Sequence, residues 1–190
     1  MPKLIEYEQV VEHMTALGMR SLYYNSGAFG PIDTSPMKFV GWIGPDDPSI
    51  RPEAMAAARR VPAPCELKLA ELVGRAWREF FPGPAWIMPK SHWAYELDFG
   101  SRQWMPAALA QLGIDAANLA PRTNAPAIEF DLSEFTLFHQ FVQTLLENLR
   151  GSDFALAFPD HPTLCTIHHH KQIWWVTTDA RELEQLSSLF

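Results

Sequence analysis

Histidines and tryptophans concentrate in one carboxy-terminal segment, residues 158–179, which reads FPDHPTLCTIHHHKQIWWVTTD. It contains four of the seven histidines, two adjacent tryptophans and one of the two cysteines. Imidazole is the commonest metal-ligating side chain, and tryptophan is enriched where proteins make energetically important contacts. The segment is therefore where chemistry or binding is to be sought first.

A metal site is one interpretation of these histidines. If a strand continues through His170, then His168 and His170 project to the same side with the H-x-H spacing of many ligand pairs. Zinc enzymes add a third protein ligand, for which the candidates are His161, His92, Glu96 and Asp98. Of these we name His161 as the third ligand and Glu96 or Asp98 as a further ligand or base. This alternative predicts a metal-dependent hydrolase that holds a divalent transition metal such as zinc with His161, His168 and His170.

The polar tip of a β-hairpin is the interpretation that we favour. Residues 163–169 and 173–178 are rich in strand-forming types, and HHHKQ lies at the reversal between them. Adjacent strand residues face opposite sides, so we expect one of the two tryptophans in the core and the other partly exposed. The residues predicted to form a binding surface are His168, His169, His170, Trp174 and Trp175.

Composition restricts the kind of partner. The formal net charge of −7 and the pI near 5.4 argue against nucleic acid, because phosphate binding requires clustered Lys and Arg. Cys65 and Cys165 are too few for a disulfide framework and too far apart for a metal knuckle, which favours a reducing compartment. We see neither a signal peptide nor an apolar run long enough to span a membrane, so we expect a cytoplasmic protein without a membrane partner.

The elements that must position these residues predict a single α+β domain over residues 1–190. Apolar stripes at helical spacing predict two long amphipathic helices, at 66–81 and 132–150, with shorter helices at the amino and carboxyl termini. The remaining runs predict a mostly antiparallel sheet on which the two long helices pack. We also expect a short helix from Pro52 to Arg60, and a capping box of Asp131 and Glu134 before the second long helix.

The run from His92 to Phe99 alternates between apolar and polar residues, which predicts a strand that forms a hairpin with the run ending at Met88. In such a strand His92, Glu96 and Asp98 share one face. A wet face of an antiparallel sheet explains this pattern without any acid or base chemistry.

These observations favour a non-enzymatic binding protein of the bacterial accessory or immunity type, whose contact surface is the histidine-rich hairpin and whose partner is a protein or a small molecule. No cofactor is expected, unless the metal alternative holds. A cysteine nucleophile at Cys165 paired with His169 lacks a visible orienting group, so we do not expect one. A third interpretation places a small-molecule pocket under the loop from Ser26 to Pro36.

Overall fold

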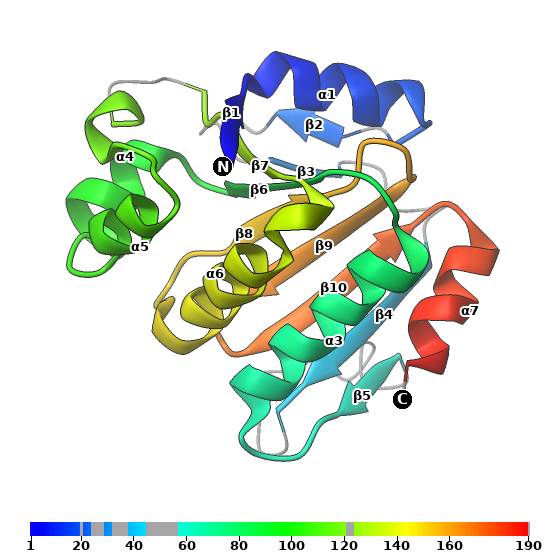
Figure 1. Cartoon of the computed structure of the whole chain (residues 1–190). Coiled ribbons are helices and arrows are strands. Elements are labelled where there is room, and N and C mark those ends of the chain that lie inside the picture. The colour runs from blue at the N-terminus through cyan, green and yellow to red at the C-terminus, as the bar shows by residue number, and fades with distance from the viewer. Residues whose placement is uncertain (20, 24–28, 32–37, 45–56, 121–123, 190) are drawn as a thin grey trace.

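The computed structural model describes residues 1–19, 21–23, 29–31, 38–44, 57–120 and 124–189. These residues form an α+β fold around an eight-stranded sheet with the order β1-β7-β6-β8-β9-β10-β4-β5 (Figure 1). Neighbouring strands pair antiparallel, except that β4 and β5 are parallel. The strands of this sheet are β1 (Lys3–Ile5), β4 (Lys38–Ile43), β5 (Ala58–Arg60), β6 (Ala85–Pro89), β7 (Ala127–Phe130), β8 (Phe154–Ala157), β9 (Thr163–His168) and β10 (Gln172–Thr177). Two short strands, β2 (Ser21–Tyr23) and β3 (Phe29–Pro31), pair with each other.

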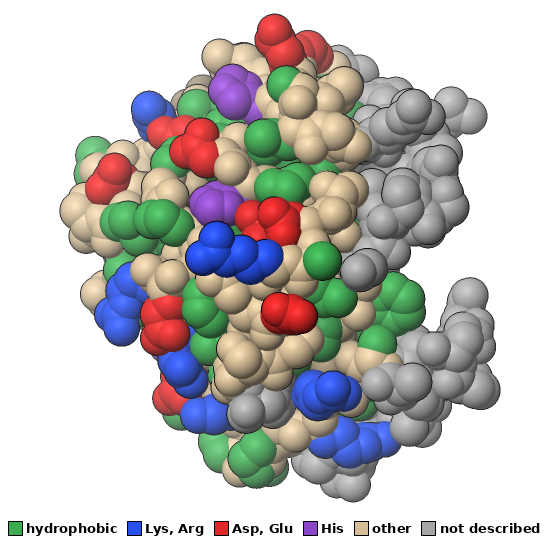
Figure 2. All heavy atoms as spheres, turned by 90° about the vertical axis from the view of Figure 1, so that its right-hand side faces the viewer, with side chains coloured by type: hydrophobic (Ala, Val, Ile, Leu, Met, Phe, Trp, Pro, Cys, Tyr) green, Lys and Arg blue, Asp and Glu red, His purple; other side chains and the backbone are tan. Residues whose placement is uncertain are grey.

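The helices are α1 (Tyr7–Ala16), α3 (Cys65–Phe80), α4 (Trp93–Tyr95), α5 (Met105–Gln111), α6 (Phe135–Asn148) and α7 (Ala180–Ser188), with a π-helical turn η1 (Glu96–Gly100) and the 3₁₀ turns η2 (Ala116–Asn118) and η3 (Leu132–Glu134). In the described part of the chain, none of them combines the length and apolarity that a bilayer crossing requires. Figure 1 shows α3 and α6 side by side on one face of the sheet, with α7 at its β4–β5 end. Figure 2 views the molecule from that end, where acidic, basic and apolar side chains are interspersed.

Close packing of α3 against α6 builds the core on this face. Trp77 of α3 is fully buried, and its ring centroid lies 4.3 Å from that of Phe138 on α6. Gly74 allows this approach, because a Cβ at that position would lie 2.9 Å from the ring of Phe135. The two helices therefore meet through an aromatic layer at the place where their apolar stripes face each other.

A second aromatic layer lies between α3 and the hairpin of β9 and β10. Trp175 has no exposed surface, and its ring packs with those of Phe81 and Phe158, which contact each other as well. The centroid distances are 5.7 Å from Trp175 to Phe81, 6.0 Å from Trp175 to Phe158 and 4.5 Å from Phe81 to Phe158. Burying a phenylalanine contributes about 1.5–3 kcal/mol of transfer free energy. This layer fixes which face of β10 points into the core.

Most predicted elements are present. The expected α+β class with a mostly antiparallel sheet is confirmed, and α3 and α6 lie where the two long helices were predicted. The capping box is also confirmed, because the Asp131 amide donates to Glu134 and the Asp131 carboxylate accepts from the following turn.

The predicted strand at His92–Phe99 is wrong. The residues form α4 and η1, and β6 pairs with β7 and β8 instead of forming a hairpin with them. His92 caps the turn by accepting from the Tyr95 amide at 3.0 Å, and the Trp93 indole donates to the Pro126 carbonyl at 2.8 Å. These tertiary and capping bonds override the alternating pattern.

Two other predictions fall partly or wholly on residues that the structure does not describe. The predicted helix from Pro52 to Arg60 is wrong at its end, because Ala58–Arg60 is strand β5, and its earlier residues lie outside the described ranges. Of the proposed pocket loop, only β3 is described, so the pocket itself lies outside the described residues.

Gly41 of β4 provides a test of the packing on the opposite face of the sheet. It lies across from Trp174 of β10, whose Cε3 would be 2.6 Å from a Cβ at this position. We expect Gly41→Ala to displace the indole and to lower the free energy of unfolding by about 1–3 kcal/mol, measured by denaturant titration. The loss should shrink in a Trp174→Ala background, and an equal loss in both backgrounds would contradict this explanation.

Candidate functional site

The tip of the β9–β10 hairpin brings three consecutive imidazoles together. His168 ends β9 and pairs with Gln172 at the start of β10, which leaves a three-residue turn between them. Lys171 closes the turn with φ of 59°, and its amide donates to the His168 carbonyl at 3.0 Å. Three-residue hairpin loops use a left-handed residue at this place, although it is uncommon for a non-glycine.

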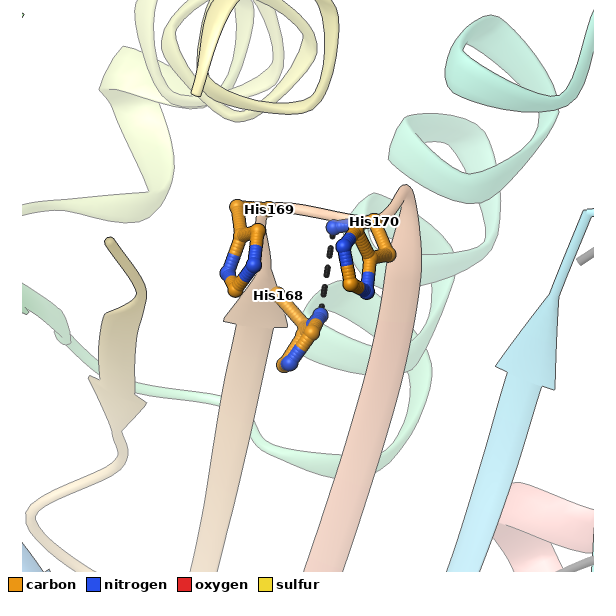
Figure 3. Close-up of side chains that lie close together, drawn as sticks. All are labelled: His168, His169 and His170. Carbon is orange, nitrogen blue, oxygen red and sulfur yellow. Dashed lines mark hydrogen bonds between the residues drawn. The ribbon is translucent and has the colours of Figure 1, made fainter. Parts of the chain in front are cut away.

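The three rings face one another across the turn (Figure 3). Their centroids are separated by 4.3 Å for His168 and His169, 4.2 Å for His169 and His170, and 5.0 Å for His168 and His170. One ring nitrogen from each residue lies within 4.8 Å of the other two. Among the described residues, this is the group of His, Cys, Asp or Glu side chains close enough together to hold a metal ion. We call His168, His169 and His170 the histidine tip.

Asp153, the residue before β8, holds the middle histidine. Its Oδ1 accepts from the His169 amide at 3.1 Å and lies 2.8 Å from His169 Nδ1. A carboxylate in this place favours the proton on Nδ1 and leaves the lone pair of Nε2 free. Its other oxygen lies 3.9 Å from His168 Nε2, so one carboxylate faces two of the three rings.

His168, at the end of β9, is partly buried. Burial lowers its pKa below the ordinary value of 6.5, and the opposing effect of Asp153 does not compensate. Its Nδ1 accepts from the His170 amide at 3.1 Å, which places the proton of the neutral ring on Nε2. The fold thus favours neutral His168, the form that can bind a metal.

A lysine lies beside the tip on β6's carboxyl-terminal side. Lys90 donates from Nζ to Thr166 Oγ1 at 3.4 Å, and its amide donates to the Asp153 carbonyl at 2.9 Å. Burial lowers the pKa of Lys90, with the Asp153 carboxylate acting in the opposite direction. The local charge of Asp153 is therefore partly balanced by Lys90.

An ion pair fixes the far side of the turn. Lys171 Nζ contacts Glu66 Oε1 in the first turn of α3, and this hydrogen bond lowers the pKa of Glu66. The tip is therefore attached to β8 through Asp153 and to α3 through Glu66.

Not all the residues predicted for a metal site lie here. His161 contacts Glu182 of α7 at 2.8 Å, at the other end of β9, and at about 3.3 Å per residue the two ends of this strand are on the order of 17 Å apart. The structure therefore places His169, not His161, with His168 and His170. Glu96 is buried among serine hydroxyls, and Asp98 is exposed on η1.

The predicted binding surface is divided by the sheet. Trp174 is partly exposed, and its indole donates to Gln172 Oε1 at 2.6 Å, whereas Trp175 is fully buried and cannot contact a partner. Cys165 is also buried, which raises its pKa well above the ordinary value, so a thiolate pairing with His169 is not supported.

Asp153, Lys90 and Glu66 are the site residues that the sequence interpretation missed. Each reaches the hairpin from a distant segment, and the Glu66 contact spans 105 residues. The one local signal was the position of Asp153, a polar residue immediately before a fully apolar strand.

The lowered pKa of His168 predicts a pH dependence of stability. Because the folded pKa lies below the unfolded one, the unfolded chain binds the proton first as the pH falls. Stability linked to His168 is therefore fully present above pH 6.5 and is lost progressively below it. We expect His168→Gln to reduce this slope in urea unfolding, with the exposed His13→Gln on α1 as control. An unchanged slope in His168→Gln would contradict the prediction.

Comparisons with known proteins offer no relative from which a function could be transferred. No family model matches the chain, and no curated protein or solved structure matches it either. Any function assigned to the chain therefore rests on the geometry of its own residues.

Proposed function

We propose that this protein binds a divalent transition metal ion through His168, His169 and His170. The observation that supports the proposal is the convergence of three ring nitrogens within 4.8 Å of one another. In addition, Asp153 is hydrogen-bonded to Nδ1 of His169. Metal-ligating histidines almost always donate a hydrogen bond from their other ring N–H to a carboxylate, a carbonyl or water, which fixes the tautomer and makes the ligand more basic. Asp153 is placed to do this for His169.

Binding requires a modest closure of the tip. Two nitrogens that share a tetrahedral zinc ion at 2.0–2.1 Å lie about 3.3 Å apart. The ring nitrogens of the histidine tip lie within 4.8 Å of one another, so the farthest pair must approach by up to about 1.5 Å. If His168 binds through Nδ1, it must also release the His170 amide, whose hydrogen bond is drawn in Figure 3.

The ligand set selects the class of metal. Imidazoles suit Zn²⁺, Cu²⁺ and Ni²⁺, whereas Ca²⁺ and Mg²⁺ require oxygen ligands. Three protein ligands leave one coordination position open for water, which is what the hydrolase alternative needs. Glu96, expected as a base, is engaged by three hydroxyls, so we propose metal binding and do not extend it to hydrolysis.

Metal titration of untagged protein is the direct test. We expect one Zn²⁺ or Ni²⁺ per chain by calorimetry and elemental analysis, and loss of binding in the His168→Ala, His169→Ala, His170→Ala triple variant. His13→Gln is the matched control, because this exposed histidine lies on α1 outside the tip. Wild-type protein without a stoichiometric metal after loading would refute the proposal.

Asp153→Asn tests the carboxylate separately. The amide keeps an acceptor for the His169 N–H but removes the charge that orients and polarises the ring. We expect the metal affinity to fall about 10- to 100-fold, as it does when other residues that hydrogen-bond a metal-ligating histidine are replaced. An unchanged affinity would show that Asp153 does not contribute to metal binding, and it would not bear on the role of the three histidines.

A second proposed function is that of a non-enzymatic binding protein of the accessory or immunity type, with a protein partner. It is supported by an aromatic pair on the face of the sheet opposite α3. Phe39 of β4 is 44% exposed, and its ring centroid lies 6.3 Å from that of the partly exposed Trp174. Aromatic side chains that remain exposed together are typical of contact surfaces.

Affinity capture from a native lysate tests this surface. We expect the Phe39→Ala, Trp174→Ala double variant to lose a partner that the wild-type protein retains, while both stay folded by circular dichroism. Phe99→Ala is the matched control, since this aromatic side chain is 74% exposed on η1. Identical partner lists for all three proteins would count against the surface. We also propose a cytoplasmic location for the protein. Cys65 and Cys165 are free thiols, and the reducing cytosol is the compartment where thiols remain unpaired.

A further inference from the structure

Glu96 is a completely buried carboxylate without an ion-pair partner among the described residues. Three serine hydroxyls donate to it: Ser91 at 3.0 Å, Ser101 at 2.7 Å and Ser152 at 3.1 Å. Burying a carboxylate is costly unless hydrogen bonds replace its hydration, and here they do so from three directions.

The three serines belong to three different segments. Ser91 follows β6, Ser101 follows η1, and Ser152 precedes β8. Glu96 therefore joins the ends of two neighbouring strands to the π-helical turn. The two ends are also joined directly, by the bond from the Lys90 amide to the Asp153 carbonyl.

The π-helical turn directs Glu96 inward. Ser101 donates its amide to the Glu96 carbonyl at 2.9 Å, which closes the wide turn. Gly100 leaves room for it, since a Cβ there would lie 2.7 Å from the Tyr95 ring and 3.3 Å from Glu96 Oε2. π-Helical turns are rare in proteins, and those that occur are often found at functional sites.

Ser152 connects this buried carboxylate to the histidine tip, because the next residue is Asp153. The Ser152 hydroxyl is held by Glu96, and Asp153 Oδ1 accepts both the amide and Nδ1 of His169. The bond from the Ser152 hydroxyl and the bond from the Lys90 amide to the Asp153 carbonyl together restrain the backbone that carries the Asp153 side chain.

We infer that Glu96 is a positioning residue for the histidine tip: through Ser152 it fixes the Asp153 carboxylate, and Asp153 in turn orients His169. The inference rests on the proposed metal site for its functional meaning. The geometric part, the restraint of Asp153 and of the His169 amide, concerns the metal-free protein and can be tested alone.

The test compares two serines that both donate to Glu96. Ser152→Ala removes the bond from the residue next to Asp153, whereas Ser101→Ala removes the bond that the residue after η1 makes to the same oxygen, Oε2. We expect Ser152→Ala to speed hydrogen exchange of the His169 amide in the metal-free protein and to lower the Zn²⁺ affinity on the order of tenfold. Ser101→Ala should change neither, although both variants lose one bond to the same buried carboxylate.

The outcomes separate this inference from the proposed function. Equal effects of the two serine variants, or no effect of Ser152→Ala on the His169 amide, would show that Glu96 is structural only and would overturn the inference. Wild-type protein that binds no Zn²⁺ would refute the metal site, and selective loss of His169 protection in Ser152→Ala would still support the positioning role. Glu96→Met, which keeps a similar side-chain length but removes both acceptor oxygens, should reproduce the Ser152→Ala effect on the same amide.

Discussion

Burial of Trp175 between the sheet and α3 is the constraint on which the carboxy-terminal hairpin depends. Because strand residues alternate, fixing Trp175 inward turns Trp174 outward and places its cross-strand neighbours on the outer face. His168 lies on that outer face, opposite Gln172, while Ile167 and Cys165 enter the core. The aromatic layer therefore decides the direction of side chains that take no part in it.

Buried carboxylates fasten the two ends of the same hairpin in different ways. At the open end, Glu182 accepts from Thr163 and Thr177 and contacts His161, which ties α7 to β9 and β10. At the tip, the fastening is indirect, because Glu96 holds the segment before β8 and Asp153 then holds His169. In both places serine or threonine hydroxyls donate the hydrogen bonds that water would otherwise provide to the buried side chain. Each carboxylate therefore acts as a fixed acceptor that connects separate segments.

The apolar stripes of the two long helices predicted the elements that are present, whereas the alternation of apolar and polar residues from His92 to Phe99 predicted a strand that is absent. The stripes of α3 and α6 identified the core helices, since a helix that packs on a sheet must present one apolar face. The alternation from His92 to Phe99 also looked like one buried face, yet Trp93 is buried with its indole bonded to Pro126, and Phe99 is largely exposed. The alternation was compatible with a strand, but distant partners set the backbone.

The sequence by itself determined the hairpin, the place of its turn and the division of the tandem tryptophans between core and surface, because these follow from local composition and from the two-residue period of a strand. Only the tertiary structure decided which groups meet at the tip. His161 was an equal candidate in sequence but lies a whole strand away, while Asp153 and Glu66 arrive through strand pairing and helix packing. Contacts between segments so far apart depend on the packed core, and no local pattern specifies them.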